Sequence, residues 1–145
     1  MNSKQSGIKK SPNLLLGDRV TTQSGSFDIA ADIRWVGSDL LICIHGGEKP
    51  HIGAVAAAHP RPSLKDTAVM SATSSVICYT AHKEDELARH AAEKLAAALN
   101  TRVVVTAGIH WDNLSEAGIN QVVENSRKLI ALILENAKAT IETPS

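Results

Sequence analysis

A first loop, residues 45–51, concentrates residues that could bind an anion; its sequence is His-Gly-Gly-Glu-Lys-Pro-His. Gly46 and Gly47 permit positive φ angles and a close approach of the backbone, so successive N–H groups could form a concave anion site. Lys49 would add a positive charge beside them. The pattern predicts a phosphate-binding site, although a glycine-rich hairpin loop with a surface lysine would contain the same residues.

A second loop, residues 108–114, could contact a flat ligand. Gly108 would let the chain leave a buried strand and present His110 and Trp111 ahead of a helix. An indole in a chain this poor in aromatic residues is typical of a stacking platform, or else of a side chain that covers a sheet edge. Because strand ends on one side of a sheet converge, we expect His51 to lie near His110.

Other catalytic and metal-binding patterns are missing from the sequence. Four histidines surround the predicted strand ends: His45, His51, His59 and His110. Their spacing matches no recognised zinc pattern, so we predict no metal site. No Gly-x-Ser-x-Gly elbow is present, and Cys43 and Cys78 lie in apolar runs that predict buried, unreactive thiols. We therefore predict no catalytic residue.

Composition narrows the class of partner. The 145 residues carry a formal net charge of zero and no basic block, which disfavours a nucleic-acid or anionic-membrane partner. Residues 1–12 are polar and resemble no secretory signal, and no apolar run reaches the roughly 20 residues of a membrane helix. We therefore expect a cytoplasmic protein. With one Phe, one Tyr and two Trp, its core must consist mainly of aliphatic residues.

Shifts in composition divide the chain into a mobile N-terminal tail (1–25), a single domain (26–138) and a C-terminal tail (139–145). Within the domain, strands are predicted at residues 27–35, 39–44, 52–58, 74–80 and 101–107. The first two form a hairpin, and Pro60 and Pro62 are expected to end the third.

Two helices complete the prediction. Leucines and alanines at helical spacing predict one over residues 83–99, with acidic residues in its first turn, and Ser115 is expected to cap the last helix. The order β-β-β-β-α-β-α indicates an α+β fold with an antiparallel or mixed sheet of about five to six strands. No Rossmann or Walker glycine pattern occurs.

The periodicity also predicts one core shared by the sheet and the helices. Its expected members are Phe27, Ile33, Leu41, Ile44, Val76, Leu95, Val104, Val123 and Ile130. A small, alanine-rich core and zero net charge favour association, so we expect a homodimer formed through a sheet edge or the last helix.

The two loops also resemble a known family. Residues 46–55 and 107–112 resemble the LpdD-like prenylated-flavin chaperones, the small D subunit associated with gallate-type decarboxylases, and the similarity extends over residues 27–134. The layout is more distantly similar to the small proteasome assembly chaperones. The LpdD-like resemblance implies a non-catalytic accessory protein that binds prenylated FMN or delivers it to a UbiD-type aromatic-acid decarboxylase.

This implication assigns roles to the candidate site residues. Gly46, Gly47 and Lys49 would contact the flavin phosphate, and the ring would lie against His51, His110 and Trp111. Two alternatives remain open: a protein-assembly chaperone with no small ligand, and a small histidine- or metal-dependent enzyme.

Overall fold

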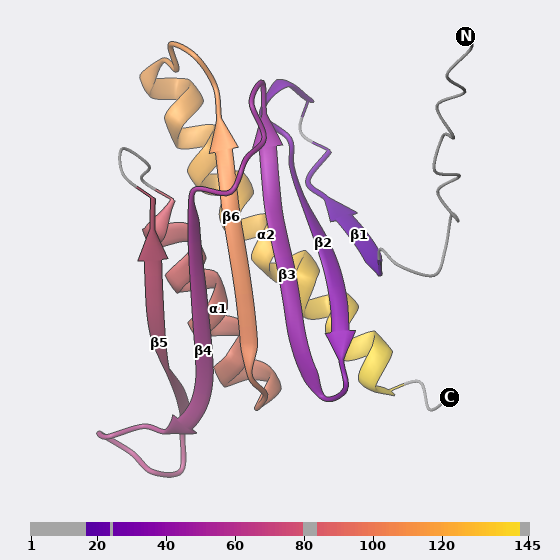
Figure 1. Cartoon of the computed structure of the whole chain (residues 1–145), viewed down its shortest axis with the longest axis vertical. Coiled ribbons are helices and arrows are strands. Elements are labelled where there is room, and N and C mark those ends of the chain that lie inside the picture. The colour runs from indigo at the N-terminus through magenta and orange to yellow at the C-terminus, as the bar shows by residue number, and fades with distance from the viewer. Residues whose placement is uncertain (1–16, 24, 80–83, 143–145) are drawn as a thin grey trace, which may run out of the picture.

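The computed structural model describes residues 17–23, 25–79 and 84–142. These residues form a mixed six-stranded sheet with two helices on one face, which confirms the predicted α+β class (Figure 1). The elements are β1 (Asp18–Thr21), the short 3-10 helix η1 (Gly25–Phe27), β2 (Ile29–Val36), β3 (Asp39–Gly47), β4 (Ala54–Pro62), β5 (Met70–Cys78), α1 (Asp85–Leu99), β6 (Val103–His110) and α2 (Glu116–Glu142).

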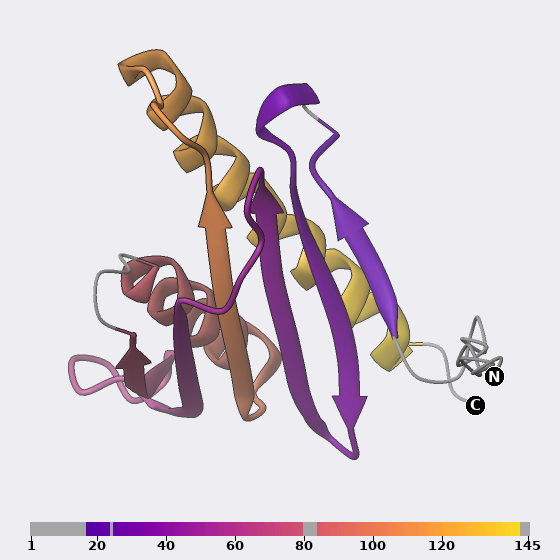
Figure 2. The same cartoon turned by 45° about the horizontal axis from the view of Figure 1, so that its top comes forward.

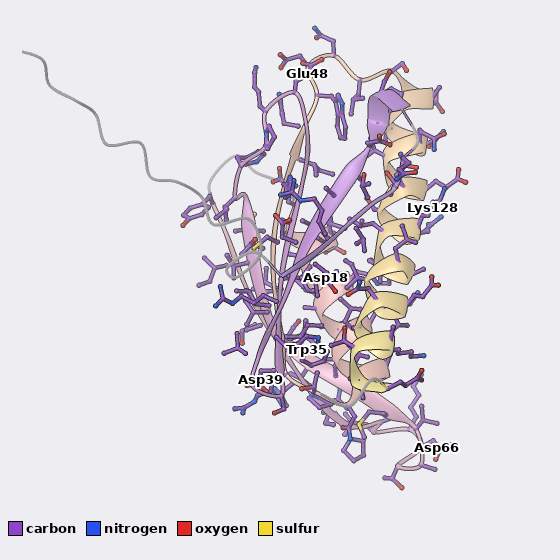
Figure 3. All side chains as sticks on the ribbon, turned by 90° about the vertical axis from the view of Figure 1, so that its right-hand side faces the viewer. Asp18, Trp35, Asp39, Glu48, Asp66 and Lys128 are labelled. Carbon is purple, nitrogen blue, oxygen red and sulfur yellow. The ribbon has the colours of Figure 1, made fainter. Side chains whose placement is uncertain are left out.

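The strand order in the sheet is β1-β2-β3-β6-β4-β5. Strand β6 enters between β3 and β4, and it runs parallel to β3 but antiparallel to β4. The ends of β3 and β6 and the start of β4 therefore meet at one end of the sheet. Figure 3 shows Glu48, in the first loop, at this end, with Asp39 and Asp66 at the other.

The two helices cover different parts of the same sheet face. Helix α1 packs on β4, β5 and β6, and α2 packs on β1 and β2 (Figure 2). The alanines predicted to build the core lie fully buried or nearly so on both sides of the α1–sheet contact: Ala88, Ala91, Ala92 and Ala96 on α1, and Ala54, Ala56 and Ala58 on β4. Such small side chains let a helix approach a sheet closely. The opposite, open face of the sheet carries neither of these helices.

Several strands are longer than predicted. Strand β4 continues through Pro60 and Pro62, so the prediction that these prolines end it is wrong. Beyond Ala58, β4 pairs with β5 but no longer with β6, and a proline that lacks an N–H group is tolerated on such a one-sided stretch. Strands β3 and β6 extend to Gly47 and His110, so the start of each predicted loop belongs to a strand.

The predicted tails overlap regular structure. Strand β1 lies within residues 1–25, where it pairs with β2, and residues 1–16 fall outside the described part of the chain. Helix α2 passes the predicted boundary at residue 138 and ends at Glu142. Helix α1 agrees closely with its prediction, and Asn100 ends it in the left-handed conformation, with a φ of 50°.

The predicted core is partly correct. Ile33, Ile44, Leu95 and Ile130 are buried, whereas Leu41 is half-buried and Val104 is 36% exposed. The alternation of β3 and β6 places the last two on the open face, although their strands are apolar throughout. Val123 is 43% exposed on α2.

The two cysteines also differ from the prediction of buried thiols. Cys43 is half-buried and Cys78 is exposed, and neither forms a disulfide. Cys78 is exposed because it ends β5, which lies at the edge of the sheet.

Candidate functional site

The first and second loops meet at the end of the sheet, as expected from their strands. The carbonyl oxygen of His110 accepts hydrogen bonds from the N–H groups of Glu48 and Lys49, at 2.8 and 3.4 Å. The segment between β3 and β4 then crosses β6 on the open face (Figure 1). It is anchored where the Gly53 N–H donates to the carbonyl of Ala107 at 2.9 Å.

Two glycines make this close approach possible. Gly47 has a φ of +84°, so the predicted positive φ is present, and a Cβ there would overlap the carbonyl oxygen of His110. A Cβ on Gly108 would overlap the carbonyl oxygen of His51. The backbone of His51 therefore lies directly against β6 at Gly108, and Gly108 precedes His110 by two residues.

Lys49 is held within the protein by the second loop. Its Nζ donates to both carboxylate oxygens of Asp112, at 3.1 and 2.9 Å, and His110 Nε2 lies 2.8 Å from Asp112 Oδ1. The N–H groups of Glu48 and Lys49 are already donated to His110. The assignment of a phosphate to Gly46, Gly47 and Lys49 stays a prediction, and a bound phosphate would have to compete with these contacts.

The pKa of Asp112 reports the contact of its carboxylate with Lys49 and His110. The hydrogen bond from Lys49, followed by that from His110, holds the pKa of Asp112 below its usual value. Because the pKa is lower in the folded state, the contact stabilises the fold above the ordinary value of about 3.9 and is lost as the pH falls through the lowered pKa. We expect an NMR titration of Asp112 to show a midpoint below that value.

Replacing Lys49 with methionine should return the Asp112 midpoint toward its ordinary value, because the largest cause of the shift is removed. Asp32 is the matched control: its pKa is also lowered, mainly by a hydrogen bond from Arg19, and should be the same in both proteins because Lys49 does not contact it. An Asp112 midpoint unchanged by Lys49→Met would contradict the contact.

Trp111 is held by the N-terminal part of the domain. Its Nε1 donates to the carbonyl oxygen of Ser26 at 3.0 Å, and its ring meets that of Phe27 edge-on, with centroids 5.8 Å apart. Asn125 is buried and donates to the carbonyl of Phe27 at 2.7 Å, which fixes this corner to α2. The indole is thus half-buried and packed against the core, while its role as a stacking platform stays a prediction.

His51 connects the first loop to the start of α1. Its Nδ1 lies 2.9 Å from the carbonyl oxygen of Lys49, and its Nε2 lies 2.8 Å from Oε1 of Glu84. The Glu84 side chain is only 10% exposed, and a Cβ on Gly53 would overlap its carboxylate. Glu84 was not predicted as a site residue, because nothing in the sequence spacing connects it to His51.

Beside Glu84, a cavity of about 770 Å³ opens between α1 and α2, with β6 at its base. Its apolar lining consists of Leu87, Ile109, Ile119, Val122, Val123 and Ile130. Its polar lining consists of Glu84, Glu86, His90, His110, Ser126 and Arg127. From the predicted set, the structure thus brings His110 to the cavity and His51 to one of its lining carboxylates, whereas Lys49 and Trp111 do not line it.

The cavity was not predicted, but the sequence contains a signal for it. Val123 was predicted to lie in the core, yet it is 43% exposed on α2, and Ile119, one turn before it, is 50% exposed. The apolar stripe of α2 is wider than the sheet covers, because Ile119 and Val123 line the cavity between α1 and α2. Excess apolar width on a helix indicates a groove or a partner.

A separate polar cluster lies on the open face. Asp32 accepts hydrogen bonds from Arg19 at 2.6 and 3.1 Å and lies 3.1 Å from His45 Nε2. The Arg19 hydrogen bond is the main cause that lowers the pKa of Asp32. This cluster ties β1, β2 and β3 together and does not reach the cavity.

Residues 17–23, 25–79 and 84–142 contain neither a grouped set of metal ligands nor a membrane-spanning helix. Within these ranges no three His, Cys, Asp or Glu side chains are grouped as metal ligands. None of the helices there is both long and apolar enough to span a membrane.

Comparison with known proteins identifies the family of this chain. Residues 23–138 match the family described as the prenylated flavin chaperone LpdD-like domain. Protein LpdD of Lactiplantibacillus plantarum is 27% identical over 104 residues, which cover 68% of this chain and 69% of that protein. The family match contains both loops and every residue that lines the cavity. The chain therefore belongs to the prenylated flavin chaperone LpdD-like family.

Proposed function

We propose that this protein binds prenylated FMN and delivers it to a UbiD-type aromatic-acid decarboxylase. The family match over residues 23–138 carries the proposal, because it includes strands β2 to β6, all of α1 and most of α2. The protein acts as an accessory rather than as an enzyme. A carrier must hold its cofactor reversibly, through an apolar surface for the ring and a few polar groups for orientation.

The candidate site supports this role. His51 and His110, both in the predicted set, lie where the two loops meet, and the cavity beside them has apolar walls. Gly46, Gly47, Lys49 and Trp111 complete the set proposed to contact the flavin.

We also propose that the protein works as a homodimer. Among the described strands, β5 pairs only with β4, and its outer edge runs from Met70 to Cys78. Ile77 is 69% exposed there, and an unpaired edge with exposed apolar side chains favours pairing with a second strand.

One experiment tests both proposals. The protein is expressed together with a flavin prenyltransferase and purified by gel filtration with absorbance and light-scattering detection. We expect a flavin spectrum to elute with the protein, at about twice the 15.4 kDa chain mass. Mixing this fraction with an apo decarboxylase should restore decarboxylation.

Two outcomes would contradict these proposals separately. Colourless protein that never activates the decarboxylase would refute cofactor delivery and favour a protein-assembly role. The mass of a single chain at tens of micromolar would refute the homodimer without affecting cofactor delivery.

A further inference from the structure

We propose that the cavity between α1 and α2 is the ligand site of this protein, and that it takes a flat apolar ring system bearing an anionic group, which Arg127 binds. The identification of this ligand as a flavin phosphate rests on the proposed function. The site itself follows from the shape and charge of the cavity.

The size and walls of the cavity suit a small aromatic molecule. Its volume of about 770 Å³ lies within the range of roughly 300–1,000 Å³ typical of small-molecule sites. Apolar side chains come from three elements: Leu87 from α1, Ile109 from β6, and Ile119 and Val123 from α2. The last two are about half exposed, so a ligand in the cavity would remove apolar surface from water.

The charged side chains that line the cavity differ in whether they have an ion-pair partner. Glu84 bonds to His51, and Glu86 accepts a hydrogen bond from Arg89 at 2.8 Å. In contrast, no carboxylate of the described residues lies within ion-pair distance of Arg127. Both lining carboxylates are thus partnered, whereas the guanidinium is available.

An available guanidinium beside apolar walls favours an anionic ligand. Arginine binds phosphate oxygens through paired, charge-assisted hydrogen bonds. His90 lines the same cavity from α1 and offers a further ring nitrogen. Lys49 differs from Arg127 in this respect, because both oxygens of Asp112 already accept its hydrogen bonds.

The site is tested with two kinds of probe on the purified protein. The dye 1-anilinonaphthalene-8-sulfonate is an apolar ring system with one anionic group and reports the cavity without reference to flavins. FMN and riboflavin differ by the phosphate, so the ratio of their dissociation constants reports the phosphate contact. Binding is followed by the fluorescence of the dye and of the flavins.

Arg127→Gln should weaken binding of the dye and of FMN about tenfold, the range for one charge-assisted hydrogen bond, and should leave riboflavin unchanged. Val123→Glu should weaken the binding of all three ligands, because it places a carboxylate in the apolar wall of the cavity. The Val123 side chain is 43% exposed, so the variant should fold, which circular dichroism checks.

Lys128→Gln is the matched control. Lys128 follows Arg127 on α2 but does not line the cavity, and Figure 3 shows it on the side of α2 away from the sheet. Lys128→Gln should bind all probes like the wild type.

The outcomes separate the site from the proposed function. Dye and FMN binding unaffected by Arg127→Gln and Val123→Glu would overturn the inference. Dye binding that depends on Arg127 and Val123, together with no binding of FMN or prenylated FMN, would keep the cavity and refute the flavin function.

Discussion

Replacing Gly108 with alanine should destabilise the protein by about 3 kcal/mol or more, which is a large fraction of the stability of a domain of this size. The added Cβ would overlap the carbonyl group of His51. Because that carbonyl belongs to the backbone, no change of rotamer can relieve the overlap. The segment after β3 would have to move away from β6, which would also break the hydrogen bond from Gly53 to Ala107. Urea unfolding followed by circular dichroism measures the effect.

Gly37→Ala is the matched control for this prediction. Gly37 lies in the β2–β3 turn with a φ of +62°, and a Cβ at this position would have no atom within 4 Å. Its replacement should cost about 1 kcal/mol, the effect of a left-handed conformation alone. A Gly108→Ala variant no less stable than Gly37→Ala would show that the chain can shift at His51 without loss.

Leu95→Ala should destabilise the protein by about 3 kcal/mol, within the range of roughly 2–5 kcal/mol for a buried leucine. Leu95 is fully buried on α1, and its neighbours Ala91, Ala92 and Ala96 are too small to fill the space that it would leave. Thermal unfolding followed by circular dichroism measures the effect.

Leu64→Ala is the control, since Leu64 is 89% exposed in the β4–β5 connection. Its replacement should change the free energy of unfolding by no more than about 0.5 kcal/mol. Equal stabilities for the two variants would mean that α1 does not pack on the sheet as described.

Local patterns predicted the elements of the fold but not how far they extend. Alternation identified β2, and leucine spacing identified α1, because each signal lies within one segment. The extent of β4 depended on which neighbour it pairs with beyond Ala58, which only the tertiary arrangement determines. Leu41 and Val104 were assigned to the core for the same reason, since an apolar strand does not show which of its faces is covered.

The candidate site shows a similar division. The meeting of the two loops followed from strand ends, and the contact of His110 with Glu48 and Lys49 confirms it. The partners of individual side chains did not follow, because Lys49 and Asp112 are far apart in sequence and are joined only through the parallel pairing of β3 and β6. The cavity depends on how α1 and α2 pack on the sheet, which no local pattern encodes.

The central position of β6 has a consequence for the order of assembly during synthesis. Strands β1 to β3 form one meander and β4 with β5 form one hairpin, and these two pieces share no ladder until β6 joins them. A nascent chain that has emerged only as far as α1 therefore has two incomplete sheets, each with an open apolar edge at β3 or β4. Such edges invite pairing with other chains, so the interval before residues 103–110 leave the ribosome is when this protein is most prone to aggregate.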